Sequence, residues 1–99
     1  MIDPGRVEGF DWDSGNARKN ERHGVSQAEA EQVFFDRRLL QAADPRHSVA
    51  ESRYHALGCT VMGRLLHVTF TLRNDGTRIR VISARDASRK ERVVYDQES

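Results

Sequence analysis

The feature that most constrains the fold of this chain is a run of three strand-like segments in its C-terminal half. Residues 53 to 60, 63 to 72 and 78 to 84 are rich in β-branched, aromatic and aliphatic side chains that alternate with polar ones. The sequence Asn74-Asp75-Gly76 between the last two segments is typical of a tight hairpin turn. Because such short connections join neighbouring strands, we expect an antiparallel meander.

Two Ser-x-x-Glu sequences predict where helices begin. In this motif the serine side chain accepts a hydrogen bond from the backbone of the third helical residue, and the glutamate of that residue bonds back to the serine. Ser26 and Glu29 therefore predict a helix that runs through about residue 35. Ser88 and Glu91 predict a second one at the C-terminal end of the chain.

The N-terminal part of the chain predicts two further elements before residue 24, and a weaker one follows residue 37. Residues 10 to 13 alternate between aromatic and acidic side chains, as in a short strand. Asp13 or Ser14 can then cap a polar helix that ends at about His23. Residues 38 to 43 indicate another short strand before a turn at Asp44-Pro45.

The order of these elements predicts an α+β fold. We expect two N-terminal helices and a C-terminal helix to pack on one face of a twisted, mainly antiparallel sheet of four to five strands. The 99 residues suffice for one domain, which we place at residues 9 to 99, and we expect residues 1 to 8 to form a flexible leader. The other face of the sheet is then left for water or a partner.

Positive charge is concentrated in one part of the chain. The formal net charge is only +1, yet residues 64 to 92 hold eight cationic side chains against three acidic ones. Fourteen of the sixteen cations in the chain are arginines, whose planar guanidinium suits phosphate groups. The period of two along residues 78 to 81 predicts that Arg78 and Arg80 lie on the face of the sheet that the helices leave uncovered, and that Ile79 and Val81 lie on the other face.

Several classes of protein are disfavoured by what the sequence lacks. No apolar run reaches the roughly 18 residues of a membrane helix, and the N-terminus does not look like a secretory signal, so we expect a cytoplasmic protein. The lone Cys59 cannot form an internal disulfide. Phosphate-binding loops, nucleophile elbows and HExxH helices are missing from the sequence. We expect no cofactor.

Spaced sequence elements from residue 10 to residue 95 resemble one protein family. In order they are Phe10-Asp11-Trp12-Asp13, Asn20, His23-Gly24-Val25-Ser26, Glu29-Ala30, Val33-Phe34, Asp44-Pro45, His47-Ser48, Glu51, Arg53, Gly58, Gly63-Arg64-Leu65-Leu66, the block from Arg78 to Arg85, Glu91-Arg92 and Tyr95. This pattern resembles the BrnT family of type II toxin-antitoxin toxins. His67 departs from it, because an apolar residue is usual at this position.

The resemblance implies a RelE-like fold and RNA cleavage that stops translation. It also implies a partner, a BrnA-like antitoxin with a ribbon-helix-helix domain, in a heteromeric complex that contacts DNA only through the antitoxin. No membrane partner is expected. The alternative is a noncatalytic module, or a decayed toxin, that only binds nucleic acid or its antitoxin. Cleavage of RNA but not DNA would distinguish the two, since deoxyribose lacks the attacking hydroxyl.

Metal-free RNA cleavage needs a base, an acid and cations that stabilise charge on the phosphate. We expect these roles to fall on six candidate residues, with Arg78 and Arg89 as RNA-binding residues. The six candidates are His23, Arg64, Arg80, Arg85, Glu91 and Tyr95.

Each candidate also has a structural alternative. The arginines can form surface ion pairs, His23 can cap a helix, Glu91 can belong to its capping box and Tyr95 can be a core-edge aromatic.

A metal site is the less favoured interpretation of Asp44, His47 and Glu51. Carboxylates and imidazole can ligate metals, and Glu51 lies four positions after His47, a spacing that places both on one side of a helix. Ser48 and Glu51 also fit a third capping box, which explains the same residues without a metal. His55 and His67 alternate with apolar residues, so we expect them to be surface or interface histidines.

Overall fold

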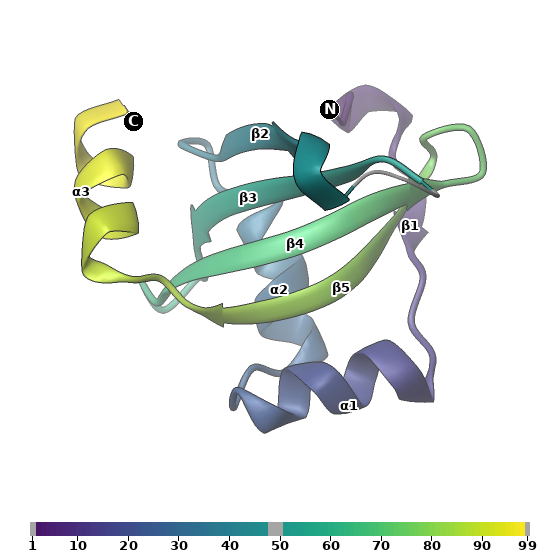
Figure 1. Ribbon diagram of the computed structural model, residues 1–99, viewed down its shortest axis with the longest axis horizontal. Helices are drawn as coiled ribbons and strands as arrows, with labels where there is room; N and C mark the ends of the chain where they lie inside the picture. The colour runs from purple at the N-terminus through teal and green to yellow at the C-terminus, as the bar shows by residue number, and fades with distance from the viewer. Residues whose placement is uncertain (1, 48–50, 99) are drawn as a thin grey trace.

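The computed structural model describes residues 2–47 and 51–98, which form three α-helices and a five-stranded mixed sheet (Figure 1). The α+β class is therefore confirmed. The strands are β1 (Gly9–Phe10), β2 (Leu40–Asp44), β3 (Arg53–Cys59), β4 (Leu65–Arg73) and β5 (Arg78–Asp86). The helices are α1 (Ser14–Arg22), α2 (Gln27–Val33) and α3 (Arg89–Glu98), with 3-10 turns η1 (Pro4–Arg6) and η2 (Pro45–His47).

The predicted meander forms the centre of the sheet. The strand order is β1-β5-β4-β3-β2, and all neighbours are antiparallel except β1, which runs parallel to β5. Asn74, Asp75 and Gly76 connect β4 to β5 with positive φ angles of 52°, 55° and 86°. Asparagine, aspartate and glycine tolerate this left-handed region better than other residues. The hairpin expected from these three residues is confirmed.

A β-bulge in β5 changes which face its later residues occupy. Phe70 is opposite Val81, but Thr69 is opposite Ser83, so Ile82 is the extra residue. An inserted residue reverses the alternation beyond it. Arg85 consequently lies on the same face as Arg80, directly opposite His67.

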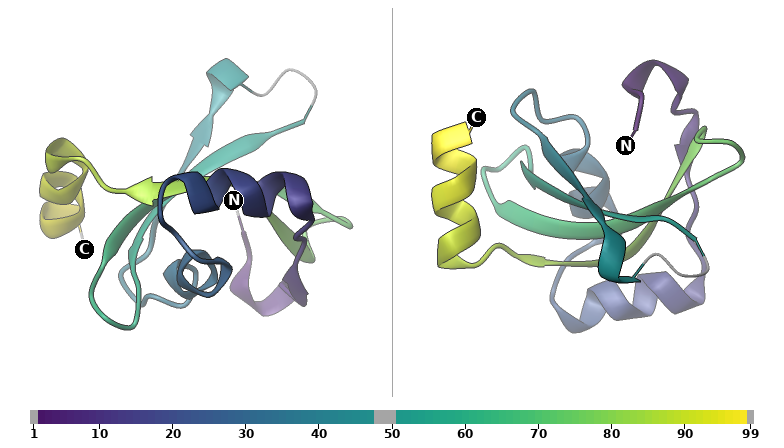
Figure 2. Two further views of the ribbon diagram at one scale, coloured as in Figure 1. Left: turned by 90° about the horizontal axis from the view of Figure 1, so that it is seen from below. Right: turned by 45° about the horizontal axis from the view of Figure 1, so that its top comes forward.

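Helices α1 and α2 shield one face of the sheet and one of its edges (Figure 2). The core on this face includes Val33 of α2 and Phe70 of β4, both fully buried. Helix α2 lies so close to β3 that a Cβ added at Gly58 would be 2.8 Å from the carbonyl oxygen of Val33. Asn16 of α1 donates from its side-chain amide to the carbonyl of Val81 at 2.9 Å, which covers the edge of β5 beyond the short strand β1.

Both predicted capping boxes are present. Ser26 and Glu29 exchange hydrogen bonds at the start of α2, and Ser88 and Glu91 do so just before α3. The N-cap of α1 is Asp13, whose side chain accepts bonds from the amides of residues 15 and 16. The third box expected at Ser48 falls outside the described residues.

Helix α3 packs on the opposite face from the other two helices. Tyr95 forms a small buried cluster with Leu57 and Leu65, whereas Leu66 belongs to the core under α2. Consecutive strand residues such as Leu65 and Leu66 point to opposite faces. The prediction that all three helices share one face is therefore wrong for α3, because its apolar partners lie on the other side of the sheet.

The N-terminal segment that we expected to be a flexible leader makes packing contacts in the structure. Ile2 is 9% exposed and belongs to the main core cluster, and its amide donates to the side chain of Gln41. Arg6 donates to the carbonyl of Asp75 in the hairpin turn. The described part of this segment thus contacts β2, at one edge of the sheet, and the turn between β4 and β5.

Candidate active site

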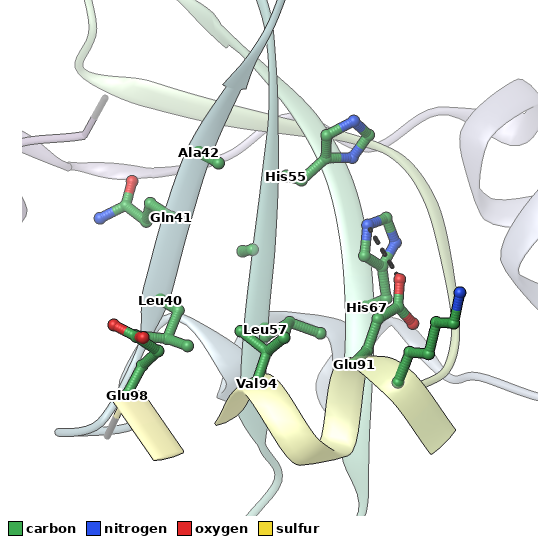
Figure 3. A pocket seen from close by; sticks show the side chains of 11 residues that line it. Leu40, Gln41, Ala42, His55, Leu57, His67, Glu91, Val94 and Glu98 are labelled. Atoms are coloured by element: carbon green, nitrogen blue, oxygen red, sulfur yellow. Dashed lines mark ion pairs between the residues drawn. The ribbon is translucent and has the colours of Figure 1, made fainter. Parts of the chain in front are cut away.

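The face of the sheet opposite α2, here called the open face, carries polar side chains from three adjacent strands. Across β3, β4 and β5 the register aligns His55 with Thr69 and Ser83, and the next row aligns His67 with Arg85. Helix α3 stands beside one end of this face (Figure 3). A groove of about 480 Å³ lies between the strands and α3, with both histidines in its lining. The histidines therefore face a space that a ligand can enter.

The imidazole rings of His55 and His67 lie together in this groove. Their centroids are 4.8 Å apart and the ring planes differ by 37°. His55 Nε2 is 2.9 Å from Oδ2 of Asp44, and its Nδ1 is 3.2 Å from the hydroxyl of Thr69. Because an ionised carboxylate only accepts hydrogen bonds, Asp44 favours the tautomer in which Nε2 of His55 carries the proton. Asp44 and Thr69 thus fix the orientation of this ring.

His67 is the more enclosed of the two histidines. Its side chain is 14% exposed, and its Nε2 is 3.8 Å from Oε2 of Glu91. Burial lowers the pKa of His67 below 6.5, because it disfavours the charged form, and the nearby Arg85 and His55 act in the same direction. Glu91 opposes this effect without reversing it. His67 is therefore neutral at pH 7.

Glu91 lies between His67 and Arg85. The Arg85 guanidinium donates to both carboxylate oxygens of Glu91, at 2.8 and 3.0 Å, and the Ser88 amide donates to the same carboxylate. The hydrogen bonds from Arg85 are the main cause that lowers the pKa of Glu91 to about 2. Arg85 remains 41% exposed at the margin of the open face. The site thus combines two imidazoles, a fixed carboxylate and an accessible guanidinium.

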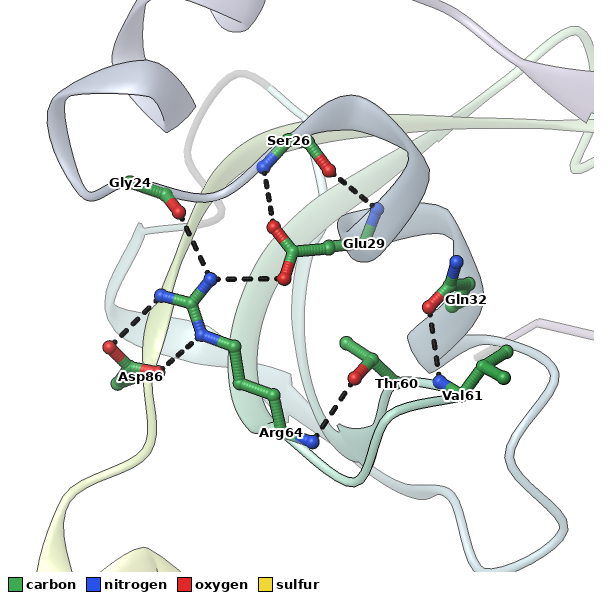
Figure 4. A network of polar contacts seen from close by, with 8 residues as sticks. All are labelled: Gly24, Ser26, Glu29, Gln32, Thr60, Val61, Arg64 and Asp86. Carbon is green, nitrogen blue, oxygen red and sulfur yellow. Dashed lines mark hydrogen bonds and ion pairs between the residues drawn. The ribbon is translucent and has the colours of Figure 1, made fainter.

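Arg64, a predicted catalytic residue, is occupied by contacts that join three parts of the chain (Figure 4). Its guanidinium makes paired hydrogen bonds of 2.7 and 3.0 Å to Asp86, and also contacts Glu29 and the carbonyl of Gly24. These contacts link β5 to α2 and to the turn before it. Arg64 therefore has the structural role that we gave as its alternative.

Arg80 and Arg78 lie at the opposite end of β5 from Arg85. Arg80 is 3.0 Å from the carboxylate of Asp13, the residue that caps α1, and Arg78 donates to the carbonyl of Phe10 in β1. The structure does not bring the three arginines predicted to be catalytic, Arg64, Arg80 and Arg85, together at one site. Instead, each arginine is held by its own carboxylate partners.

The remaining candidates are dispersed. His23 is the exposed C-cap residue of α1, and Arg89 is exposed in the first turn of α3. Tyr95 is 4% exposed, and its hydroxyl donates to Asp36 at 2.6 Å. Burial and this bond raise the pKa of Tyr95 above its ordinary value. Tyr95 therefore packs as a core-edge aromatic with a bonded hydroxyl, the alternative given for it above.

His55 and His67 were not among the predicted catalytic residues. The signal that could have identified them is their phase on the strands, because each alternates with residues of the α2 core, such as Ala56 and Val68. Side chains in that phase all point to the open face. His67 also departs from the apolar residue usual in the family pattern.

Two of the three residues considered as metal ligands, Asp44 and Glu51, have other partners in the structure. Asp44 faces His55, and Glu51 pairs with Arg73 at 3.2 Å. No group of three ligating side chains occurs within residues 2–47 and 51–98. In the same ranges, none of the helices has the length and apolar character needed to span a membrane.

Comparison with known proteins assigns the chain to a family. Residues 12–91 match the family model described as ribonuclease toxin, BrnT, of type II toxin-antitoxin system. No curated protein matches the chain in sequence. The matched region covers most of the 99 residues and includes the open face, with both histidines, Arg85 and Glu91. The chain therefore belongs to the BrnT family of ribonuclease toxins of type II toxin-antitoxin systems.

Proposed function

We propose that this protein is a metal-independent endoribonuclease with a RelE-like fold that stops translation in the cytoplasm by cutting RNA. The observation that carries the proposal is the histidine pair on the open face, 4.8 Å between ring centroids, with the Arg85–Glu91 ion pair beside it. Two imidazoles and a guanidinium can supply the base, the acid and the cation that phosphodiester cleavage without a metal needs.

The reaction takes one proton from the attacking oxygen and gives one to the departing oxygen. The ribose 2′-oxygen attacks the adjacent phosphorus, the P–O5′ bond breaks, and a 2′,3′-cyclic phosphate and a 5′-hydroxyl are formed. A base takes the proton of the 2′-hydroxyl, and an acid gives a proton to the departing 5′-oxygen. Negative charge grows on the phosphoryl oxygens and is stabilised by a cation.

The contacts of each group support a distinct role in this reaction. His67, kept neutral by burial, is the base. His55 is the proposed acid, with its ring oriented by Asp44 and Thr69. Arg85 supplies the cation, and Glu91 positions it through the two hydrogen bonds between them. Arg89, exposed on α3, remains a proposed RNA contact.

The antitoxin is the second part of the proposal. Membership of a type II family implies a protein antitoxin. We propose that it is BrnA-like and covers the open face, and that its ribbon-helix-helix domain supplies the DNA contacts of the heteromeric complex. Two exposed apolar side chains of α3, Val93 and Val94, support contact with a partner near the groove.

The test incubates antitoxin-free protein with a labelled RNA and the DNA of the same sequence, in EDTA. The variants are His67→Leu, which introduces an apolar residue in its place, and the matched control His23→Leu at an exposed histidine. We expect RNA-only cleavage that is lost in His67→Leu and retained in His23→Leu, with both variants folded by circular dichroism. Cleavage of neither nucleic acid would contradict a free-standing nuclease and favour the noncatalytic binding module.

RNA cleavage that persists in His67→Leu would support the ribonuclease activity but show that His67 is not its base. The double variant Arg80→Ala/Arg85→Ala then tests the contribution of the arginines to cleavage apart from that of the histidines. Arg80 contacts Asp13 and Asp11 at the far end of β5, so a loss that is already complete in Arg85→Ala alone assigns the phosphate contact to Arg85.

A further inference from the structure

A second hollow lies on the open face, between α1 and η2. It consists of two adjoining cavities of about 410 and 320 Å³. Both are lined by Lys19 of α1, Arg53 of β3 and Ile82 of β5; Arg46 of η2 borders one and Arg80 the other. The cations thus come from four elements: η2 and β3, which follow one another in the chain, and α1 and β5, which are distant from them in sequence.

This hollow adjoins the candidate active site. His55 lines both the larger of the two cavities and the groove under α3. Thr69 and Ser83, in the same row of the sheet as His55, add hydroxyl groups to its floor. A chain-like ligand can therefore extend from the histidine pair into the hollow without leaving the face.

The charge of the hollow is positive despite two acidic residues in its lining. Asp44 faces His55 at 2.9 Å, and Glu51 faces Arg73 at 3.2 Å. The lining nevertheless holds four cationic side chains, Lys19, Arg46, Arg53 and Arg80, against these two carboxylates, and Lys19 and Arg46 are exposed. Low-dielectric walls of like charge attract anions to such a hollow.

We propose that this basic groove binds the phosphates of single-stranded RNA next to the bond cut at the histidine pair. The proposal rests on the proposed ribonuclease function and adds Lys19, Arg46 and Arg53 as substrate-positioning residues. Arg53 and His55 are two residues apart on β3, so their side chains emerge on the same face about 7 Å apart. Successive phosphates of one extended strand can therefore meet the hollow and the histidines in turn.

The lining favours contact with the sugar-phosphate backbone rather than with bases. Apart from His55, which is assigned to the reaction itself, none of the described side chains that line the two cavities is an aromatic ring on which a base could stack. Cations and hydroxyl groups bind phosphate oxygens without reading sequence. The groove should therefore bind RNA of any sequence, with an affinity that falls steeply as salt increases.

The test measures binding apart from cleavage. A fluorescent RNA that carries 2′-O-methyl groups throughout cannot be cut by its own ribose oxygen, so its anisotropy reports binding by the full chain across a salt series. The groove variant is Lys19→Ala/Arg46→Ala, and the matched control is Arg22→Ala/Arg37→Ala, which removes the same charge at exposed residues outside the groove.

We expect the groove variant to bind at least 10-fold more weakly at low salt. Its salt slope should fall by about 1.4, because each phosphate of a single strand that a cation no longer neutralises lowers the slope by about 0.7. The control should change affinity by less than 3-fold.

Equal RNA affinities and equal salt slopes in the two double variants would contradict the proposal that the basic groove binds RNA. If the groove variant binds RNA more weakly but the parent protein cuts no RNA, the binding proposal stands and the ribonuclease proposal is contradicted. The failure of one proposal can therefore be distinguished from the failure of the other.

Discussion

Glu91 shows how one side chain can serve two of the functions considered for it. Its carboxylate accepts a hydrogen bond from the Ser88 amide in the capping box, and it also forms an ion pair with Arg85. The capping interpretation and the site interpretation are therefore compatible at this residue. Its side chain is 24% exposed, so the ion pair is only partly screened by water.

The ionisation of Glu91 should make the fold sensitive to acid. Its pKa is lowered to about 2 in the folded protein, so its stabilising effect is complete above the ordinary glutamate pKa near 4.5 and is lost as pH falls from there towards 2. Glu91→Gln keeps an acceptor for the cap but loses the charge. We expect the variant to be less stable by roughly 2 kcal/mol at pH 7, with a gap that closes near pH 2.

Urea unfolding of both proteins between pH 2 and pH 7 measures this gap. A difference in the free energy of unfolding that does not change with pH would show that Glu91 stabilises the fold by capping alone.

At the scale of elements, the sequence predicted what depends on near neighbours. The two capping boxes and the hairpin at Asn74-Asp75-Gly76 are present because their hydrogen bonds and φ angles involve residues close in the chain. The extra residue Ile82 was not predicted, because a bulge depends on how β5 fits against β4. Without it, strict alternation from Arg80 would have turned Arg85 away from His67.

The histidine site was missed for a related reason. His55 and His67 lie on strands joined by antiparallel pairing, and their closeness depends on the register between β3 and β4. The side of the sheet chosen by α3 was likewise not predicted, since the apolar partners of Tyr95 come from two strands. Local patterns specify elements, whereas register specifies which side chains meet.

The contact between α2 and β3 depends on the missing side chain of Gly58. A Cβ there would lie 2.8 Å from the Val33 carbonyl and 2.9 Å from its Cγ1, so the helix would have to move. We expect Gly58→Ala to lower the free energy of unfolding by about 2 kcal/mol, in the range of other overpacked cores. Gly5→Ala is the control, because its nearest contact is an ordinary 3.4 Å.

Thermal and urea unfolding compare the two variants with the parent chain. A Gly58→Ala protein as stable as the Gly5→Ala protein would contradict the close approach of α2 to β3.

At the scale of the whole molecule, α2 covers one face of the sheet and α1 covers one edge, whereas the open face has α3 at one end and is hollowed beside it (Figure 2). The histidine pair, the groove under α3 and the basic groove all lie on this open face. An antitoxin that occupies the face blocks catalysis and substrate binding together.

Histidine modification can test this arrangement. His55 is 34% exposed in the free protein, and His23 is exposed at the end of α1. We expect the antitoxin to slow modification of His55 by diethyl pyrocarbonate by 10-fold or more, read by peptide mass spectrometry, while His23 reacts as before. Unchanged modification of His55 in the complex would show that the antitoxin binds elsewhere.

The parallel pairing of β1 with β5 has a consequence for folding during synthesis. Phe10 meets Ile79 in the finished sheet, yet at about 5 to 20 residues per second roughly 3 to 14 seconds separate their addition to the nascent chain. The partner strand of β1, and with it Arg85, does not exist until translation has passed residue 80. The sheet of this ribonuclease toxin can therefore be completed only after nearly all of the residues in the family match, 12–91, have been added to the chain.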